Sequence, residues 1–270
     1  MATDRRVSAV TGGGAGIGRA IVERLAADGD LVVALDRDSA ALSALARRAD
    51  EAGWAVETHL LDVADDSAVE RVAAALDERH GSLDVLVCAA GIQRYGTVEE
   101  TSLALFDEVV GVNLRGVFSV CHSLMPLVKR GGGGSVVVVS SIQAYASQAG
   151  VAAYAATKGA LLSLVRAMAV DHARDGVRVN AVCPGSVDTP MLRWAAELFS
   201  DGRPVDDVVA EWGRTHPIGR VAQASEVAAA VAYLASPQAG FVTGADLKVD
   251  GGVMAALGVA LPESHPGKDR

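Results

Sequence analysis

Several features that signal particular partners are scarce in this chain of 270 residues. Aromatic residues make up 4% of the chain, and none are interleaved with basic clusters. Lys and Arg number 24 against 33 Asp and Glu, which gives a net charge of -9. A negative balance argues against a nucleic-acid surface or an anionic membrane surface. We therefore expect no nucleic acid and no membrane among the partners.

Cysteine and metal-ligand patterns are equally sparse. Cys88, Cys121 and Cys183 are odd in number, far apart and without Cys-x-x-Cys spacing, which is typical of reduced thiols in a cytoplasmic protein. The six histidines show no ligand spacing, so we expect no metal site. No apolar signal region precedes the first predicted strand, which agrees with a cytoplasmic location. The uncharged run 131–157 is rich in Gly and Ser, which favours a buried core over a membrane span.

The apolar residues that are present alternate between two periods. Short apolar runs at 7–10, 31–36, 55–61 and 84–88 indicate buried strands, and amphipathic segments between them indicate helices. This alternation predicts an α/β fold, a doubly wound (Rossmann-type) parallel sheet flanked by helices on both faces. No Pro/Ser-rich linker or charge block divides the chain, so we expect a single dinucleotide-binding and catalytic domain over 1–270.

A glycine-rich loop lies between the first predicted strand and helix. It reads Thr11-Gly12-Gly13-Gly14-Ala15-Gly16-Ile17-Gly18. Glycines at this place let the backbone approach a pyrophosphate, whose charge is held by N–H groups at the start of the helix. The spacing is Thr-Gly-x-x-x-Gly-x-Gly instead of the usual Gly-x-Gly-x-x-Gly, and no Lys-Ser/Thr pair follows as in a Walker A loop.

Asp36 ends the second predicted strand, about twenty residues beyond the loop. A carboxylate there hydrogen-bonds the adenosine ribose hydroxyls and repels a 2′-phosphate, so Asp36 favours NAD over NADP. Ala15 agrees, because no basic residue stands there to meet that phosphate. Arg37 is the counterargument, since its side chain can reach a phosphate. As an alternative, Asp36 is the N-terminal residue of a helix, which is compatible with the first interpretation.

Tyr154 and Lys158 are four residues apart in an Ala- and Leu-rich helical segment, so their side chains share one face. A nearby ammonium stabilises a phenolate and lowers the pKa of the phenol. Such a tyrosine serves as a general acid or base. Ser141 follows a buried strand, where its hydroxyl can hold a carbonyl or alcohol oxygen. The alternative is an exposed helix face, because the pattern is short.

Five of these positions fall at the ends of predicted strands, namely Gly12, Asp36, Asp62, Gly91 and Ser141. In a parallel sheet the carboxyl ends of the strands share one edge, where ligands bind. The sequence therefore predicts one shared site.

This set of motifs resembles the short-chain dehydrogenases/reductases of the group usually called classical. The resemblance covers Val7 to about Gly252, and Ser141 lies thirteen residues before Tyr154, as in that family. It implies that Tyr154 is the acid/base, that Lys158 binds the nicotinamide ribose, and that Asn113 holds a water in a proton relay. The residues expected to bind the cofactor are Gly12, Gly14, Gly16, Ile17, Gly18, Asp36, Arg37, Asp62, Val63, Ala89, Ala90, Gly91, Tyr154, Lys158, Pro184, Gly185, Val187 and Thr189.

One departure and three further expectations accompany the resemblance. The family's Asn-Asn-Ala-Gly reads Cys88-Ala89-Ala90-Gly91, for which we expect altered local hydrogen bonding and retained activity. A longer insert, about 187–217, is expected to be a substrate lid. The tail, about 254–270, ends in Pro, Gly and charge, and its last residues are expected to be disordered. Wide apolar surfaces on the helices that start near Ser102 and Gly150 suggest a homotetramer, unless both are buried in the monomer.

The substrate is the least determined part of the site. The residues expected to face it are Gln93, Arg94, Ser141, Gln143, Tyr145, Gln148, Tyr154, Met191, Arg193 and Trp194. Polar side chains and two arginines suit a small polyhydroxylated or carboxylated substrate, unless the arginines are solvated surface residues. The chain also resembles family members that act on sugars and sugar acids.

The expected function is an NAD-dependent interconversion of a secondary alcohol and a ketone, on a small-molecule substrate such as a sugar, sugar acid or polyol. One alternative is a 3-oxoacyl thioester reductase, but that reaction usually runs with NADPH, which Asp36 disfavours. Another is a nucleotide-sensing protein without catalysis. A pure sensor needs no acid/base group, so the set of Asn113, Ser141, Tyr154 and Lys158 disfavours it.

Overall fold

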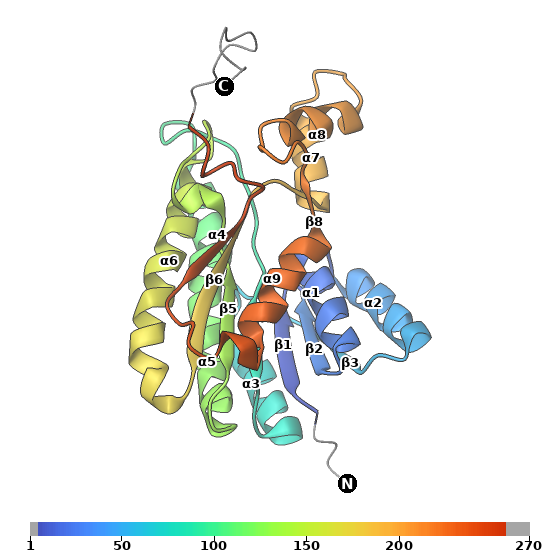
Figure 1. Cartoon of the computed structure of the whole chain (residues 1–270), viewed down its shortest axis with the longest axis vertical. Coiled ribbons are helices and arrows are strands. Elements are labelled where there is room, and N and C mark those ends of the chain that lie inside the picture. The colour runs from blue at the N-terminus through green and yellow to red at the C-terminus, as the bar shows by residue number, and fades with distance from the viewer. Residues whose placement is uncertain (1–4, 258–270) are drawn as a thin grey trace, which may run out of the picture.

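The computed structural model describes residues 5–257, and a seven-stranded parallel sheet forms its centre (Figure 1). The strand order is β3-β2-β1-β4-β5-β6-β9, so the direction of winding reverses between β1 and β4. This order confirms the predicted doubly wound fold. The strands are β1 (Val7–Thr11), β2 (Leu31–Asp36), β3 (Val56–Leu60), β4 (Val85–Cys88), β5 (Ser135–Val139), β6 (Arg178–Pro184) and β9 (Asp246–Val249).

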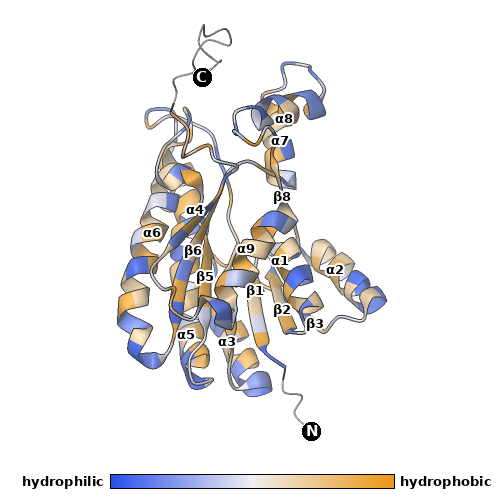
Figure 2. Ribbon diagram, viewed as in Figure 1, coloured by the Kyte–Doolittle hydropathy of each residue, from blue (hydrophilic) through white to orange (hydrophobic). Residues whose placement is uncertain are grey.

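Helices cover both faces of the sheet and bury a separate apolar core on each. One core contains residues of α1 (Gly16–Ala27), α2 (Ser39–Ala52) and α9 (Ala224–Ala235). The other contains residues of α3 (Asp66–His80), α5 (Gly116–Arg130) and α6 (Ala152–His172). The inner strands are mostly apolar because both of their faces are buried, as in β5, where four valines follow Ser135. Figure 2 shows this apolar centre between the helices.

Two local features shape the chain near the site, a helix cap and a π-helical turn. Asp38 caps α2, because its side chain accepts hydrogen bonds from the N–H groups of Ala40 and Ala41. Asp36 is therefore not the N-terminal residue of that helix. Between α4 (Leu103–Val110) and α5 the chain forms one π-helical turn, Gly111–Arg115, which contains Asn113. Such turns occur often at functional sites, and the sequence pattern alone does not predict one.

The predicted lid region is folded, and much of it is helical. It contains β7 (Val187–Asp188), α7 (Pro190–Leu198) and α8 (Val205–Gly213), and β7 pairs with β8 (Ala222–Gln223) apart from the main sheet. Thr189 caps α7 and Pro190 follows at its first position, a start signal that is visible in the sequence. The two helices share a small apolar cluster of their own, which contains Ala196, Val208 and Val209. Figure 1 shows them standing beyond one end of the sheet.

Short 3₁₀ turns complete the described elements, at Ile142–Ala144, Ala173–Asp175 and Pro237–Ala239. Within residues 5–257, none of the helices has the combined length and apolar character needed to cross a membrane. In the same range, no group of three or more His, Cys, Asp or Glu side chains is arranged to hold a metal ion. Most of the predicted tail lies outside the described residues.

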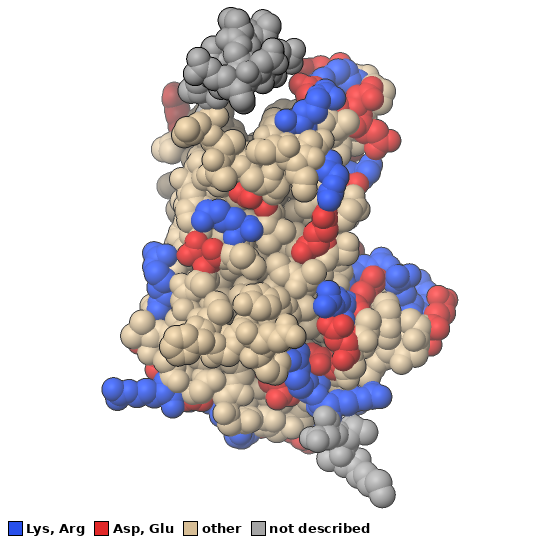
Figure 3. Space-filling model, viewed as in Figure 1, with Lys and Arg blue, Asp and Glu red and all other residues tan. Residues whose placement is uncertain are grey.

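Figure 3 shows charged side chains along the edges of the face that carries α9, with a broad uncharged area in its middle.

Candidate active site

Two neighbouring cavities lie along the edge where the strands end. The smaller, about 250 Å³, is lined by residues of the glycine loop, by Asp36 and by the chain that follows β3 and β4. The larger, about 610 Å³, is lined by Ser141, Tyr154, Lys158 and the segment after β6. Both are lined by Ile17, Gly91 and Thr189, so they form one continuous groove. Its position and length suit an extended ligand such as a dinucleotide.

The glycine loop packs tightly against the end of β4. Gly12 has φ 68°, and a Cβ there would lie 2.8 Å from the Cα of Ala90. Gly16 has φ 53°, and a Cβ there would enter the space toward Thr189, 3.5 Å away. Ala15, at the N-cap of α1, offers no side-chain cap, so the first N–H groups of that helix are available to an anion. The loop therefore fits the pyrophosphate of a dinucleotide.

Asp36 is fixed by backbone N–H groups on both of its carboxylate oxygens. Oδ2 accepts a hydrogen bond from Gly14 N at 2.9 Å, and Oδ1 accepts one from Asp38 N at 3.0 Å. A Cβ on Gly14 would lie 3.0 Å from Oδ2, so glycine is needed for this approach. The carboxylate thus stands at the rim of the smaller cavity with a defined orientation.

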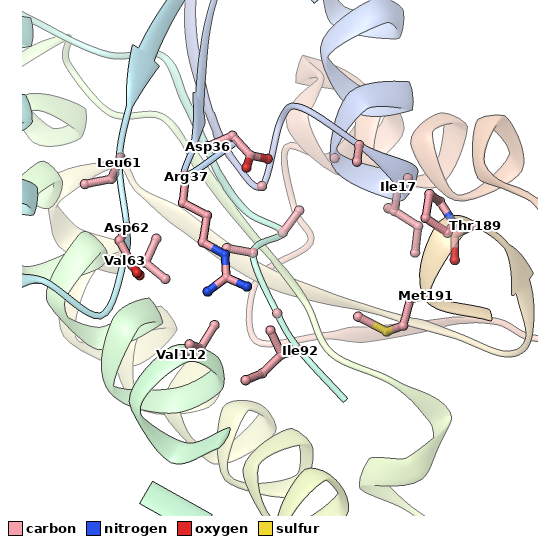
Figure 4. A pocket seen from close by; sticks show the side chains of 18 residues that line it. Ile17, Asp36, Arg37, Leu61, Asp62, Val63, Ile92, Val112, Thr189 and Met191 are labelled. Atoms are coloured by element: carbon pink, nitrogen blue, oxygen red, sulfur yellow. The ribbon is translucent and has the colours of Figure 1, made fainter. Parts of the chain in front are cut away.

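The chain after β3, which carries the predicted cofactor residues Asp62 and Val63, forms one end of the groove. Asp62, Val63 and Leu61 line the smaller cavity opposite the glycine loop, and Asp62 Oδ1 accepts a hydrogen bond from Ala64 N at 3.0 Å. Figure 4 shows Arg37 extending into this cavity, while Asp36 turns toward the glycine loop. A cation and a carboxylate therefore both reach the place where a ribose or its phosphate would lie.

Tyr154 and Lys158 lie on adjacent turns of α6 and are both buried. Lys158 Nζ lies 5.5 Å from the centre of the Tyr154 ring and donates a hydrogen bond to Val139 O at 3.0 Å. The hydroxyl of Ser141 accepts a hydrogen bond from Gln143 N at 3.1 Å, which fixes it at the end of β5. The structure thus brings all three side chains to the larger cavity.

Burial dominates the protonation equilibria of this pair. It raises the pKa of the Tyr154 phenol to about 12, although a hydrogen bond with Ser141 acts in the opposite direction. It also lowers the pKa of the Lys158 ammonium to about 8. Both shifts favour the neutral form, because a charge is poorly solvated inside the protein. Burial therefore opposes the lowering of the tyrosine pKa that the sequence led us to expect from Lys158.

Asn113 is fully buried and is held by the chain after β4. Its Nδ2 donates to Ile92 O at 2.8 Å, and its Oδ1 accepts from Ile92 N at 2.8 Å. A further hydrogen bond, at 3.3 Å, joins Nδ2 to Thr157 Oγ1 on α6. The side chain thus connects the π-helical turn with two walls of the groove, and its place in a proton relay remains a prediction.

The remaining predicted cofactor residues also border the groove. Those that line one cavity or both are Gly12, Gly16, Ile17, Gly18, Val63, Ala89, Ala90, Gly91, Pro184, Gly185, Val187 and Thr189. Gly14 does not line either cavity, and it acts through its hydrogen bond to Asp36.

The structure does not support four of the side chains expected to face the substrate. Arg94 pairs with Glu108 at 2.6 Å, and Arg193 pairs with Asp188 at 2.7 Å, and neither lines the larger cavity. Arg193 also contacts Asp206 at 3.0 Å. These carboxylates satisfy the guanidinium groups, so the arginines behave as the solvated surface residues of the alternative.

Two aromatic side chains also lie outside the lining of the larger cavity. Tyr145 turns toward β9, where its hydroxyl donates to Asp246 and its ring contacts Lys248 Nζ at 4.3 Å. Trp194 packs against Tyr95, with ring centres 5.8 Å apart. The expected side chains that do line the cavity are Gln93, Ser141, Gln143, Gln148, Tyr154 and Met191.

Two residues of the site were missed in the sequence analysis. Tyr95 lines the larger cavity together with Tyr154. His216 is buried, and its Nε2 accepts a hydrogen bond from Ser186 N at 3.1 Å, which connects the chain after α8 with the segment after β6. Tyr95 follows Gln93 by two residues, so its position after the fourth predicted strand could have predicted that it faces the substrate. No motif or spacing in the sequence predicts a place for His216 in the site.

The altered tetrapeptide after β4 has its own hydrogen bonds. The hydroxyl of Thr11 accepts from Ala89 N at 3.1 Å and from Ala90 N at 3.2 Å. Cys88 Sγ lies 3.8 Å from Cys121 Sγ on α5. Thr11 thus joins β1 to the chain that carries Gly91, without the asparagines of the family pattern.

A doubly wound sheet with a glycine loop, an acidic second strand end and a Ser-Tyr-Lys set defines a nicotinamide-dependent oxidoreductase. The comparisons agree. A family model described as Enoyl-(Acyl carrier protein) reductase matches residues 12–254. The chain is 37% identical over 260 residues to a meso-2,3-butanediol dehydrogenase of Serratia marcescens, covering 96% of this chain and 98% of that protein.

Solved structures show the same relation. An aldohexose dehydrogenase of Thermoplasma acidophilum has a TM-score of 0.88 and 35% identity, covering 96% of this chain and 98% of that one. An actinorhodin polyketide ketoreductase with NADPH has a TM-score of 0.89 and 36% identity, covering 94% and 99%. The chain belongs to the short-chain dehydrogenase/reductase family, as its motifs predicted.

The contact between Thr11 and the chain after β4 gives a first prediction. Thr11→Val keeps the shape of the side chain but leaves the N–H groups of Ala89 and Ala90 without their acceptor, at a cost of about 1–3 kcal/mol in the free energy of unfolding. Thr11→Ser keeps the hydroxyl and retains most of that stability. Urea denaturation of the three proteins measures the difference. Equal midpoints for Thr11→Val and the wild type would contradict this role.

Proposed function

We propose that this protein is an NAD-dependent oxidoreductase that interconverts a secondary alcohol and a ketone. The observation that carries the proposal is that Ser141, Tyr154 and Lys158 meet at one cavity that continues into the groove of the glycine loop. The butanediol and aldohexose dehydrogenases to which the chain is similar are named as dehydrogenases of hydroxyl-bearing compounds, which supports the same reaction class.

The chain's own residues divide the work at the reacting oxygen. Ser141 holds the oxygen of the alcohol or ketone by its hydroxyl, and Tyr154 takes or gives the proton. Lys158 lies beside Tyr154 and hydrogen-bonds Val139 O, so its ammonium has a fixed position. When bound, NAD supplies the acceptor for a hydride from the alcohol carbon, so the products are a ketone, NADH and a proton.

The preference for NAD rests on the anchored carboxylate of Asp36. Two backbone N–H groups hold it, so it does not turn away easily from an incoming 2′-phosphate. Asp36 thus acts against NADP, even though the polyketide ketoreductase of similar structure carries NADPH. Arg37 contributes an opposing attraction, and we propose that the fixed carboxylate outweighs it.

For the substrate, we propose a small neutral molecule. The glutamines at 93, 143 and 148 supply hydrogen bonds for hydroxyl groups, as a sugar or polyol requires. The sugar-acid proposal loses its support, because Arg94 and Arg193 are engaged by carboxylates of the protein. The helices α7 and α8 act as a lid, since α7 lines the cavity through Met191, Leu192 and Ala195.

We propose that the protein forms a homotetramer and works in the reducing cytoplasm. Leu103 on α4, Phe118 on α5 and Val170 on α6 are exposed apolar side chains, so they are not buried within the monomer. Phe241, in the loop before β9, and Leu247, on β9, are exposed apolar side chains of a second surface. Two such surfaces suffice for a tetramer. The three cysteines are free and buried, which suits a reducing compartment.

The acid/base role of Tyr154 is tested by Tyr154→Phe. The variant keeps the ring but not the exchangeable proton, so kcat should fall by at least about 100-fold while NADH still binds. Steady-state rates and the fluorescence of bound NADH measure the two effects separately. A variant with more than about a tenth of the wild-type turnover is incompatible with the assignment.

The cofactor preference is tested by Asp36→Asn, which removes the charge and keeps the size. Loss of the repulsion between the Asp36 carboxylate and the 2′-phosphate of NADP, about 1–2 kcal/mol, should raise the ratio of kcat/KM for NADP over NAD by about 10-fold. Arg37→Gln provides the matched control, since it should lower use of NADP. If the wild type prefers NADP, the proposed role of Asp36 is wrong.

Light scattering tests the assembly. The wild type should have the mass of a tetramer, and Val170→Asp and Phe241→Asp should each reduce it to a dimer, because each places a charge in a different apolar contact. Gln238→Asp, on an exposed turn, serves as the control for an added charge. A monomeric wild type would show that these surfaces have another purpose.

A further inference from the structure

The larger cavity has a polar wall and an apolar wall. The polar wall comes from the chain after β5, where Gln143 Nε2 donates to Gln148 Oε1 at 3.2 Å. The apolar wall comes from the chain after β4 and from α7 and α8, through Tyr95, Phe199 and Trp212. Ser141 and Tyr154 also line this cavity, so a substrate held at its reacting oxygen contacts these walls.

Full charge is nearly absent from this lining. Among the described residues that line the cavity, Lys158 is the only Lys, Arg, Asp or Glu, and it is hydrogen-bonded to Val139 O. A substrate carboxylate entering the cavity would lose water without gaining a free counterion, which is costly. The cavity therefore favours a neutral substrate over a hydroxy acid.

The apolar wall is built around an aromatic cluster, which consists of Tyr95, Trp194 and Phe199. The Tyr95 and Phe199 rings meet edge to face, with their centres 4.7 Å apart. The Tyr95 ring also contacts the Trp194 ring, with their centres 5.8 Å apart. Phe199 remains 45% exposed, so it has apolar surface left to cover. Flat aromatic surfaces pack best against other rings or compact apolar bodies.

The aromatic cluster lies close to the chemistry. Tyr95 lines the same cavity as Ser141 and Tyr154. An apolar group attached at or next to the reacting carbon can therefore contact Tyr95 while the reacting oxygen is held. The cavity has a volume of about 610 Å³, which is enough for a ring-bearing alcohol, and it is bordered by Pro184 and Gly185 at the predicted nicotinamide end.

We propose that the substrate is a neutral secondary alcohol or ketone whose reacting carbon belongs to or adjoins an apolar ring, and that Tyr95 and Phe199 are specificity-determining residues which hold that ring. The proposal rests on the proposed alcohol dehydrogenase function and narrows its substrate class from hydroxyl-rich molecules such as sugars and polyols to alcohols with an apolar ring. In oxidation, the ring alcohol loses a hydride from carbon to NAD and a proton from oxygen to Tyr154, and it leaves as the ketone. Tyr95 belongs to the chain after β4 and contacts Phe199 at the end of α7, so these two segments together form the proposed contact surface for the ring.

The test compares alcohols that share the reacting group but differ in the attached body. NAD reduction is followed with cyclohexanol and 1-phenylethanol as ring substrates, with 2-butanol as the open-chain match, and with 3-hydroxybutyrate and glucose as charged and polyhydroxylated comparisons. For the wild type, kcat/KM for the better ring substrate should exceed that for each of the other three by at least about 10-fold.

Substitutions of the aromatic cluster then assign the preference to these side chains. Tyr95→Ala and Phe199→Ala should each lower the ratio of kcat/KM for the ring substrate over 2-butanol by about 10-fold, because each removes one aromatic contact. Tyr95→Phe, which keeps the ring, should leave that ratio within about 3-fold of the wild type. Because a ratio is compared, a variant that is only partly folded does not change the result.

The outcomes separate this inference from the proposed function. If the wild type oxidises 2-butanol, 3-hydroxybutyrate or glucose at least as well as both ring substrates, the alcohol dehydrogenase function stands and the ring proposal is wrong. An unchanged ratio in both alanine variants would also overturn the assigned residues. If none of the five alcohols is oxidised with NAD or NADP, the proposed function fails and the ring proposal fails with it.

Discussion

The parallel alignment of seven strands is the constraint on which the rest of the structure depends. Because every strand runs in the same direction, the chain after each strand emerges at one edge, and residues far apart in sequence meet there. Gly12, Asp36, Asp62, Gly91 and Ser141 share that edge for this reason. The helices on both faces bury the inner strands, and the groove forms at the carboxyl ends of β1 and β4, where the winding of the sheet reverses.

The two parts of the site offer different groups to a ligand. At the glycine loop these groups are backbone N–H groups, which stay available because α1 has no side-chain cap. At Tyr154 and Lys158, the exclusion of water favours neutral side chains and moves the pKa values of both groups away from their usual range. Tyr154 and Lys158, the proposed catalytic pair, therefore lie where a small change of nearby charge has a large effect on protonation, because little solvent screens it.

Much of the fold and of the catalytic set is predictable from the sequence, because the signals are local. Apolar runs such as Ser135–Val139 mark buried strands, and Tyr154 and Lys158 share a helix face by their spacing alone. Other features escape such an argument. The π-helical turn that carries Asn113 depends on how α4 and α5 pack. The helices α7 and α8 form within the insert that was expected to be a substrate lid, and of these only the start of α7 is marked in the sequence, by Thr189-Pro190.

The sequence by itself determined the order of strands and helices, the glycine loop and the Ser-Tyr-Lys set, since each depends on residues close together in the chain. Only the tertiary structure decided which side chains face the substrate. Arg94 turns to Glu108 on α4, Arg193 turns to Asp188 and Asp206, and Tyr145 turns to Asp246 on β9. Tyr95 meets Phe199 across more than a hundred residues. The energy of a contact between two side chains falls with the distance between them in space. For residues far apart in the chain, that distance is defined only by the folded structure.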